Sequence, residues 1–398
     1  MAGQREAAAA ADRLPPRGVT RRGTMFAFQR HCGTLPLRLK GVMLSCDPAA
    51  SDPITTRQGA LRLHAPGRLH LGFLDPAGSL GRPFGSLGLV IDGFETVLEL
   101  RAEQVDSVSG ETPVARAEVA RARAHLECLR QRTGCRSPLA LRLLQVLPAH
   151  AGFGSGTQLA LAVGRAFAQW HGLQVDNTTL AAWLGRGRRS GIGIAGFELG
   201  GLLLDGGPGA AGTPAPLLAR LALPEAWRVL VVQDNAAQGL SGARETQAMV
   251  ALPPLPRAAA AEICHHVLMR VLPGAAAADF AAFAAGLTHV QALLGAHFAP
   301  AQGGSAYTSA AVGAVVRCIA ETSRSRAAAG EDSEYGEDAT LGAAVGQSSW
   351  GPTAFAILPS AAAAEAALQA AASAGLVRPS LRLRIVRARN HGAVLSRH

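Results

Sequence analysis

Residues 148–158 read Pro-Ala-His-Ala-Gly-Phe-Gly-Ser-Gly-Thr-Gln and stand between a strand pattern (139–147) and a helix pattern (157–171). Three glycines in five residues let backbone N–H groups turn toward one point, where the following helix adds the positive end of its dipole. We therefore expect a phosphate site formed by Gly152, Gly154, Ser155, Gly156, Thr157 and Gln158. The alternative is a glycine-rich turn with Thr157 as the N-cap.

Strand and helix patterns alternate along the chain and predict an α+β protein of two domains. An alternating strand signal starts at Ala60, whereas residues 1–58 have scattered arginines, proline pairs and no sustained periodicity. We expect 1–58 to be a disordered extension, or an over-extended start that is not translated. Residues 59–224 then form a phosphate-binding domain and 225–398 a second α+β domain.

Individual elements follow from the same patterns. They predict separate strands at 87–92 and 96–101, and helices at 178–189, 257–271 and 276–297. The apolar stripe of the last helix suits a core or a homodimer face. No element is assigned to the glycine-dense residues 191–212, and residues 323–338 are expected to be a polar linker.

The positive charge of the chain lies mainly in its two ends. The formal net charge is +10 over 398 residues, but residues 1–58 carry +5 and residues 378–398 carry +6, so the body is close to neutral. That distribution argues against a nucleic-acid partner. Lys40 is the only lysine, which excludes Schiff-base chemistry and a Walker P-loop in the folded body.

Other broad classes are also disfavoured. The six cysteines include no Cys-x-x-Cys pair, which argues against a disulfide scaffold or a zinc ribbon. No run of apolar residues is long enough to predict a membrane span, and we see no secretory signal. We therefore expect a cytoplasmic globular protein without a membrane partner.

Three segments resemble the motifs of the GHMP kinase superfamily. Residues 65–75, Ala-Pro-Gly-Arg-Leu-His-Leu-Gly-Phe-Leu-Asp, resemble the first motif, and 148–158 resemble the second, which binds ATP phosphates. Residues 346–353, Gly-Gln-Ser-Ser-Trp-Gly-Pro-Thr, occupy the place of the third. The resemblance implies two α+β domains with the active site in the cleft between them.

Within the superfamily, the segments resemble the beta-ribofuranosylaminobenzene 5'-phosphate synthases of methanopterin biosynthesis, most specifically through Gln-Ser-Ser-Trp-Gly-Pro at 347–352. The resemblance implies condensation of phosphoribosyl pyrophosphate with 4-hydroxybenzoate or 4-aminobenzoate, loss of pyrophosphate and CO₂, and a C-riboside 5'-phosphate for tetrahydromethanopterin. The alternative is an ATP-dependent GHMP kinase. However, the aspartate that such kinases often use as a base is missing from 190–197.

The resemblance and the chemistry together nominate site residues. Expected catalytic residues are Arg68, His70, Ser190, Gln347, Trp350, Asn390 and His391. A salt bridge is the alternative role for Arg68, and core packing is the alternative for His70 and Trp350. Mg²⁺ is commonly held by phosphate oxygens and one or two carboxylates. The candidate ligands are Asp75, Asp234 and Glu245, with turn capping as the alternative for Asp75.

Overall fold

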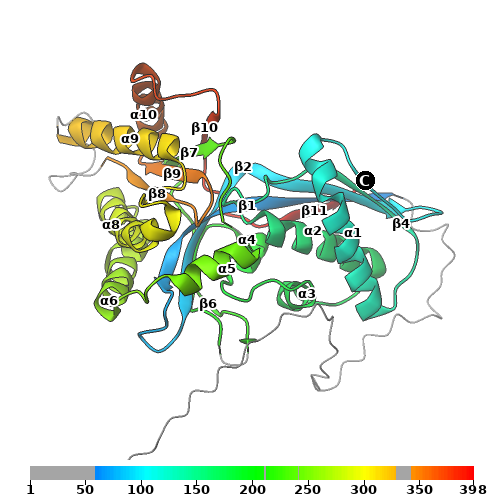
Figure 1. Cartoon of the computed structure of the whole chain (residues 1–398). Coiled ribbons are helices and arrows are strands. Elements are labelled where there is room, and N and C mark those ends of the chain that lie inside the picture. Colours follow the sequence, from blue (N-terminus) through cyan, green and yellow to red (C-terminus); the bar gives the residue numbers. More distant parts are fainter. Residues whose placement is uncertain (1–58, 210–211, 241, 329–341) are drawn as a thin grey trace, which may run out of the picture. The chain divides into compact units, whose positions relative to one another are not determined.

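The computed structural model describes residues 59–209, 212–240, 242–328 and 342–398. All of them belong to one compact unit, Leu44–His398. The expected disordered extension, 1–58, and residues 329–338 of the expected linker lie outside the described residues. Figure 1 shows an α+β architecture with two sheets, as the sequence predicts.

The larger sheet is mostly antiparallel and has the strand order β11-β1-β2-β4-β3, with β5 pairing both β2 and β6. Its strands are β1 (Ala60–Asp75), β2 (Phe84–Ala102), β3 (Ser107–Gly110), β4 (Leu139–Gln145), β5 (Leu202–Asp205), β6 (Leu217–Leu221) and β11 (Val394–Arg397). Register shifts interrupt the β1–β2 pairing between Pro66 and Arg68 and between His70 and Gly72. Such bulges change the direction in which side chains point. The first shift lies directly before Arg68 and the second directly after His70, and both residues belong to the candidate site.

The smaller sheet is buried on both faces. Its order is β10-β7-β9-β8, made of β7 (Arg228–Asp234), β8 (Ala344–Gln347), β9 (Thr353–Leu358) and β10 (Leu381–Val386). Along β7, Val229 and Val231 join one hydrophobic cluster, while Leu230 and Val232 join another. This is the period-2 alternation of a strand, and it explains the continuous apolar run in the sequence.

Helices cover both sheets. They are α1 (Pro113–Thr133), α2 (Ser155–His171), α3 (Asn177–Trp183), α4 (Ile192–Leu199), α5 (Gly242–Ala251), α6 (Arg257–His266), α7 (Leu272–Ala277), α8 (Phe280–Phe298), α9 (Ala310–Ala328) and α10 (Ala361–Ser373), with a π-helix η2 (Val267–Val271) and a 3-10 helix η3 (Ala299–Gln302). In Figure 1, α1 to α4 lie along one face of the larger sheet. Helices α9 and α10 cover one face of the smaller sheet and α8 the other.

Several element predictions are corrected. The strands expected at 87–92 and 96–101 are one strand, β2, because Glu95 and Thr96 keep pairing with β1. The helix expected over 178–189 ends at Trp183, two residues before Gly185 adopts a left-handed φ of 70°. The glycine-dense stretch contains α4 and β5. Gly200 and Gly201, between these two elements, lie against the backbones of His391 and Leu221.

The chain end returns to the larger sheet. Strand β11 pairs with β1, and the backbone of His398 exchanges two hydrogen bonds with Ala60. The predicted boundary at 224 falls between β6 and β7, so it separates the two sheets except for this last strand. The two-domain division at that residue stays a prediction.

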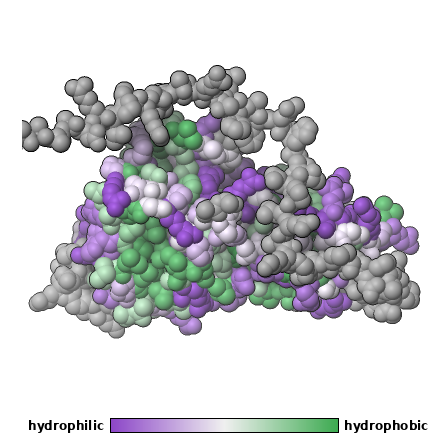
Figure 2. Space-filling model, turned by 90° about the horizontal axis from the view of Figure 1, so that it is seen from below, coloured by the Kyte–Doolittle hydropathy of each residue, from purple (hydrophilic) through white to green (hydrophobic). Residues whose placement is uncertain are grey.

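Among the described residues, no helix combines the length and the apolarity needed to cross a bilayer. On the face seen in Figure 2, apolar residues gather in the left half beside more hydrophilic ones.

Candidate active site

The glycine loop lies between β4 and α2, as predicted, but the helix begins earlier than expected. Helix α2 starts at Ser155, and Gly154 is its N-cap with a φ of 72°. The Gly154 carbonyl accepts hydrogen bonds from the N–H groups of Thr157 and Gln158, so Thr157 is not the cap. The first N–H groups of a helix have no acceptor within it, so this end can receive an anion.

Ser348 joins the three predicted motifs. Its buried hydroxyl donates to the Gly152 carbonyl at 2.7 Å and accepts from the His70 N–H at 2.9 Å. A Cβ on Gly152, whose φ is 94°, would lie 2.7 Å from the Ser348 carbonyl oxygen. The close backbone approach therefore requires glycine at this position. Residues far apart in the sequence thus form one hydrogen-bonded unit.

Arginines surround the loop with positive charge. The Arg68 Nη1 donates to the Gly152 carbonyl at 3.2 Å, and its buried Nε has no hydrogen-bond partner. Burial lowers the pKa of Arg68 to about 10, although Glu245 and Asp205 oppose the shift. Arg68 therefore stays charged at neutral pH. Arg186 lies against Gly156 and also has a buried Nε without a partner.

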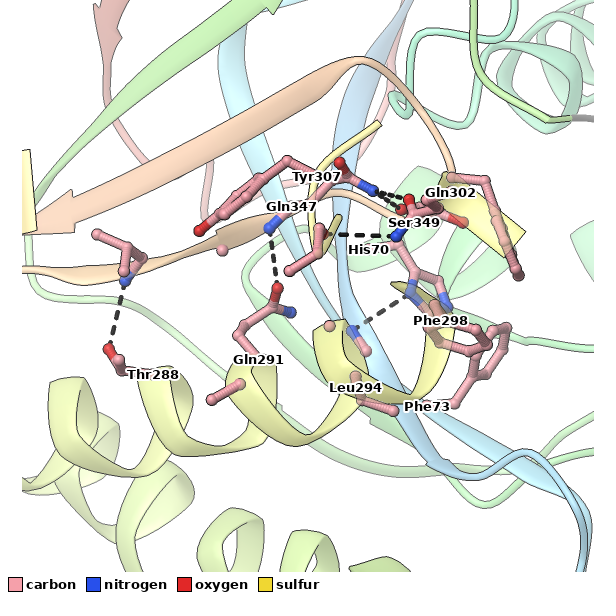
Figure 3. Close-up of a pocket in the computed structure, with 17 residues that line it drawn as sticks. His70, Phe73, Thr288, Gln291, Leu294, Phe298, Gln302, Tyr307, Gln347 and Ser349 are labelled. Atoms are coloured by element: carbon pink, nitrogen blue, oxygen red, sulfur yellow. Dashed lines mark hydrogen bonds between the residues drawn. The ribbon is translucent and has the colours of Figure 1, made fainter. Parts of the chain in front are cut away.

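A cavity of about 160 Å³ lies on the side of His70 away from the glycine loop. Figure 3 shows its lining from β1, α8 and the chain around β8. Its aromatic walls are Phe73, Phe298, Tyr307 and Trp350. Trp350 is buried and its ring lies 4.7 Å from that of Phe298. The predicted residues His70, Gln347 and Trp350 therefore meet here, and none of the described residues that line the cavity is an Asp, Glu, Lys or Arg.

Most polar groups in the cavity wall already have partners within the protein. Gln291 donates to the Leu71 carbonyl and accepts from the Gln347 N–H. The Gln347 side chain donates to Gln302 and Ser349 and accepts from the Thr308 N–H. Gln347, predicted as catalytic, therefore shapes the wall with its hydrogen bonds satisfied (Figure 3).

His70 is the exception. Its Nδ1 accepts the Gly72 N–H at 3.3 Å, which leaves the ring proton on Nε2, and Nε2 is buried without a partner. Burial, with the positive charges of Arg68 and Arg189, lowers the pKa of His70 to about 3. A neutral imidazole with a free N–H donor therefore lines the cavity. The ring packs edge-on against Phe73, 4.5 Å between centroids.

Ser190 belongs to a structural unit around Asp205, a residue that the sequence analysis missed. The Asp205 carboxylate accepts from the Ser190 hydroxyl and from the N–H groups of Ser86, Gly191, Ile192 and Gly207. Burial raises the pKa of Asp205, and the hydrogen bonds from Gly207, Ser190, Gly191 and Ile192 lower it in turn, with a net rise. Asp205 thus fixes the start of α4. Gln158 also ties α2 to α4 by donating to the Gly193 carbonyl.

The three predicted metal ligands have other partners. Asp75 accepts from the Leu80 N–H and the Ser79 hydroxyl, as a turn cap does. Asp234 accepts from Ser309 and Ala236. Burial raises the pKa of Asp234, but its hydrogen bonds outweigh this and the net pKa is lowered. Glu245 forms a two-pronged ion pair with Arg189 at 3.0 and 3.1 Å. Each of these carboxylates is thus engaged by donors of the protein, and their role as Mg²⁺ ligands stays a prediction.

Asn390 and His391 lie away from the cavity lining. The Asn390 amide pairs with the backbone of Leu223 in both directions, at 2.9 Å. His391 lies against Gly200, at the end of α4. Both residues therefore connect the chain end to α4 and β6. The functional residues that the sequence analysis missed are Arg186, Arg189, Asp205, Gln291 and Gln302. Only the Arg-rich run 186–189 offered a signal for any of them.

Comparison with known proteins shows which family and fold the chain resembles. Residues 119–201 match the GHMP kinases N terminal domain. The chain is 36% identical over 246 residues to the beta-ribofuranosylphenol 5'-phosphate synthase of Archaeoglobus fulgidus, covering 58% of this chain and 76% of that protein. It is 32% identical over 250 residues to the protein of the same name in Methanothermobacter thermautotrophicus, covering 58% and 75%.

Solved structures share the fold. A homoserine kinase from Cytophaga hutchinsonii superposes with a TM-score of 0.58 at 15% identity, over 86% of this chain and 98% of that one. At this identity the likeness concerns the fold alone.

Proposed function

The chain belongs to the beta-ribofuranosylphenol 5'-phosphate synthase family, and on that premise we propose that it condenses phosphoribosyl pyrophosphate with 4-hydroxybenzoate. The products in this proposal are pyrophosphate, CO₂ and a C-riboside 5'-phosphate, which makes the enzyme a decarboxylating pentosyltransferase. We choose the hydroxyl arene over 4-aminobenzoate because the relatives are named for a phenol product. Tetrahydromethanopterin is the proposed end of the pathway.

One observation carries the proposal: an uncharged aromatic cavity adjoins a positively charged glycine loop. At about 160 Å³ the cavity is smaller than the ~300–1,000 Å³ of pockets for drug-sized ligands, which suits one small ring. The loop and Arg68 suit a pyrophosphate, because backbone N–H groups, a helix dipole and a guanidinium all favour anions. Ser348 and His70 stand between the two.

In the proposed reaction, the C1–O bond of the ribose breaks and its electron pair leaves with pyrophosphate. Arg68 and the loop N–H groups stabilise the charge that develops on the leaving group. The ring carbon that bears the carboxylate attacks C1, and a C–C bond forms. The C–CO₂ bond then breaks, its electrons restore the aromatic ring, and no proton needs to be abstracted.

His70 has a defined part in this scheme. Its Nε2–H would donate to the substrate carboxylate at the end of the cavity nearest the loop. A neutral donor orients the carboxylate without the strong stabilisation that a cation would give. Because decarboxylation disperses that negative charge, tight ground-state binding by a cation would slow CO₂ loss. The low pKa of His70 therefore suits the chemistry.

Mg²⁺ enters the proposal as the counter-ion of the pyrophosphate, whose oxygens it commonly binds. No step is assigned to Mg²⁺, and the nominated carboxylates are all engaged by donors of the protein.

The kinase alternative lacks a free base. Residues 190–197 contain no carboxylate, and the nearby Asp205 accepts five hydrogen bonds at the start of α4. A substrate hydroxyl would therefore meet no available proton acceptor there.

The test is incubation of the full chain with phosphoribosyl pyrophosphate, Mg²⁺ and carboxyl-labelled 4-hydroxybenzoate, counting CO₂ and pyrophosphate. We expect equal amounts of both, and none with benzoate, which lacks the electron-donating para group. Release of pyrophosphate without CO₂ would contradict the proposal. Thermal stabilisation by ATP but not by phosphoribosyl pyrophosphate would favour the kinase instead.

A further inference from the structure

Two histidines and a glutamate come together on α6 and α8, outside the candidate active site. Glu262 and His266 are four residues apart on α6 and therefore share one helix face. His289 comes from α8. Their possible ligand atoms all lie within 4.8 Å of one another, and no other such group of three was found in the described part of the chain.

The geometry leaves ligand atoms available. His289 Nε2 and Glu262 Oε1 are 2.6 Å apart. The rings of His266 and His289 stack, with centroids 4.0 Å apart and planes inclined by 29°. His266 Nδ1 is buried and has no hydrogen-bond partner. This ring nitrogen, beside a histidine–carboxylate pair, is therefore free to act as a third ligand.

The surroundings of the cluster leave room for a cation. A metal binds the lone pair of a neutral imidazole, and the stacked rings of His266 and His289 bring two such groups to Glu262. Two of the three side chains, Glu262 and His289, are also exposed enough for water to reach them. A π-helix, a feature frequent at functional sites, begins at Val267, directly after His266.

We propose that Glu262, His266 and His289 form a site for a divalent transition metal of the Zn²⁺ class, bridging α6 and α8. Two imidazoles and one carboxylate are a common zinc ligand set with the fourth position open to water, whereas Mg²⁺ prefers oxygen ligands. On binding, His289 would move its ring proton from Nε2 to Nδ1, and the metal would replace that proton beside Glu262. Half-exposed side chains can make the small rotations needed.

The site would stabilise a wall of the cavity. Gln291, two residues after His289 on α8, holds both Leu71 and Gln347. A metal that joins α8 to α6 would restrict the movement of that helix. The site is separate from the proposed reaction, which draws no ligand from it.

The test uses the full chain stripped with a chelator and titrated with Co²⁺, whose visible absorption reports nitrogen and oxygen ligands, followed by displacement with Zn²⁺. We expect one ion per chain, and a melting temperature raised by Zn²⁺ but not by the same concentration of Mg²⁺. His289→Ala and Glu262→Gln should each weaken metal binding at least about tenfold. Mutation of residues that only hydrogen-bond to metal ligands already lowers metal affinity by about that factor.

His265→Ala is the matched control, because this exposed histidine neighbours the cluster without belonging to it; it should bind as the wild type does. A melting curve recorded in the presence of chelator checks that each variant folds. Glu262→Gln keeps the size and shape of the side chain, whereas His289→Ala removes the ring. No stoichiometric binding, or equal binding by both ligand variants and the wild type, would overturn the site. Either result leaves the synthase assay unaffected, so the two proposals fail independently.

Discussion

At Gly154 the backbone meets two conditions that both favour glycine. It adopts a φ of 72° as the cap of α2, and a Cβ there would lie 3.0 Å from the Arg68 Cζ. The position thus couples the conformation of the loop to the cation that faces it. Substitution here tests the anion site without touching the core.

Gly154→Val should weaken the binding of phosphoribosyl pyrophosphate by about ten- to a hundredfold. A displaced Arg68 would lose a charge-assisted hydrogen bond to the ligand, worth about 1.5–3 kcal/mol. The left-handed φ would also cost roughly 1–2 kcal/mol of stability. Calorimetric titration and urea unfolding measure the two effects separately.

Gly172→Val supplies the control. Gly172 caps the other end of α2 with a φ of 68°, but nothing lies within 4 Å of a Cβ there. This variant should lose similar stability and keep its affinity. If both variants bound phosphoribosyl pyrophosphate as tightly as the wild type does, the loop would be a structural turn only.

His70 should make stability depend on pH. The pKa of His70 is about 3 in the folded protein and about 6.5 in the unfolded chain. Between those values the unfolded state binds the extra proton, so the free energy of unfolding falls as pH decreases from 6.5 toward 3, by up to about 1.4 kcal/mol per pH unit. His70→Gln should flatten the slope, measured by urea unfolding at several pH values.

The wild type, unfolded under the same conditions, gives the comparison. Identical slopes for His70→Gln and the wild type would show that the folded protein accommodates the His70 proton. His125, whose pKa burial and nearby arginines lower to about 4, contributes equally to both proteins.

At the scale of elements, the position of α4 depends on one carboxylate. Asp205 is the last residue of β5. Its carboxylate accepts hydrogen bonds from β2, from the start of α4 and from Gly207, two residues further along the chain. Helix α4 has only eight residues and no side-chain cap of its own. Its place beside α2 therefore comes from tertiary contacts rather than from its own propensity.

Asp205→Asn should destabilise the protein by at least about 2 kcal/mol, because an amide group would face donors that now reach a carboxylate. Urea denaturation measures the loss. Asp176→Asn is the control: Asp176 caps the exposed start of α3 by accepting from the Thr179 N–H, and asparagine caps about as well as aspartate. Equal stability of the two variants would argue against this role for Asp205.

At the scale of the whole molecule, one core spans both sheets. The largest hydrophobic cluster joins Leu69 and Leu87 of the larger sheet, Val231 and Phe355 of the smaller sheet, and Phe283 of α8. Separate unfolding of the halves would expose this shared apolar surface. The two predicted domains should therefore lose their structure together.

Calorimetry of the full chain should show one thermal transition, with equal calorimetric and van't Hoff enthalpies. Limited proteolysis near residue 224 should not release two folded fragments. Two resolved transitions would instead support domains that are independently stable and would favour the predicted division.

Much of the fold was predictable because local patterns and tertiary structure agree in it. The strand that starts at Ala60, the strand pattern at 139–147 and the glycine loop follow from period and turn chemistry. Short elements in the glycine-dense stretch were not predictable. An eight-residue helix and a four-residue strand have too few residues to show a period, and their partners lie elsewhere in the chain.

By itself, the sequence determined the α+β class, the glycine loop and the family motifs, since these depend on adjacent residues. Only the tertiary structure decided which side chains face the cavity. His70 remains a free donor because Ser348 and Gly72 occupy its backbone and its Nδ1. The carboxylates of Asp75, Asp234 and Glu245 accept hydrogen bonds from N–H and O–H groups that the sequence does not place near them. Hydrogen-bond partners distant in sequence are chosen by packing, and packing is a property of the whole chain.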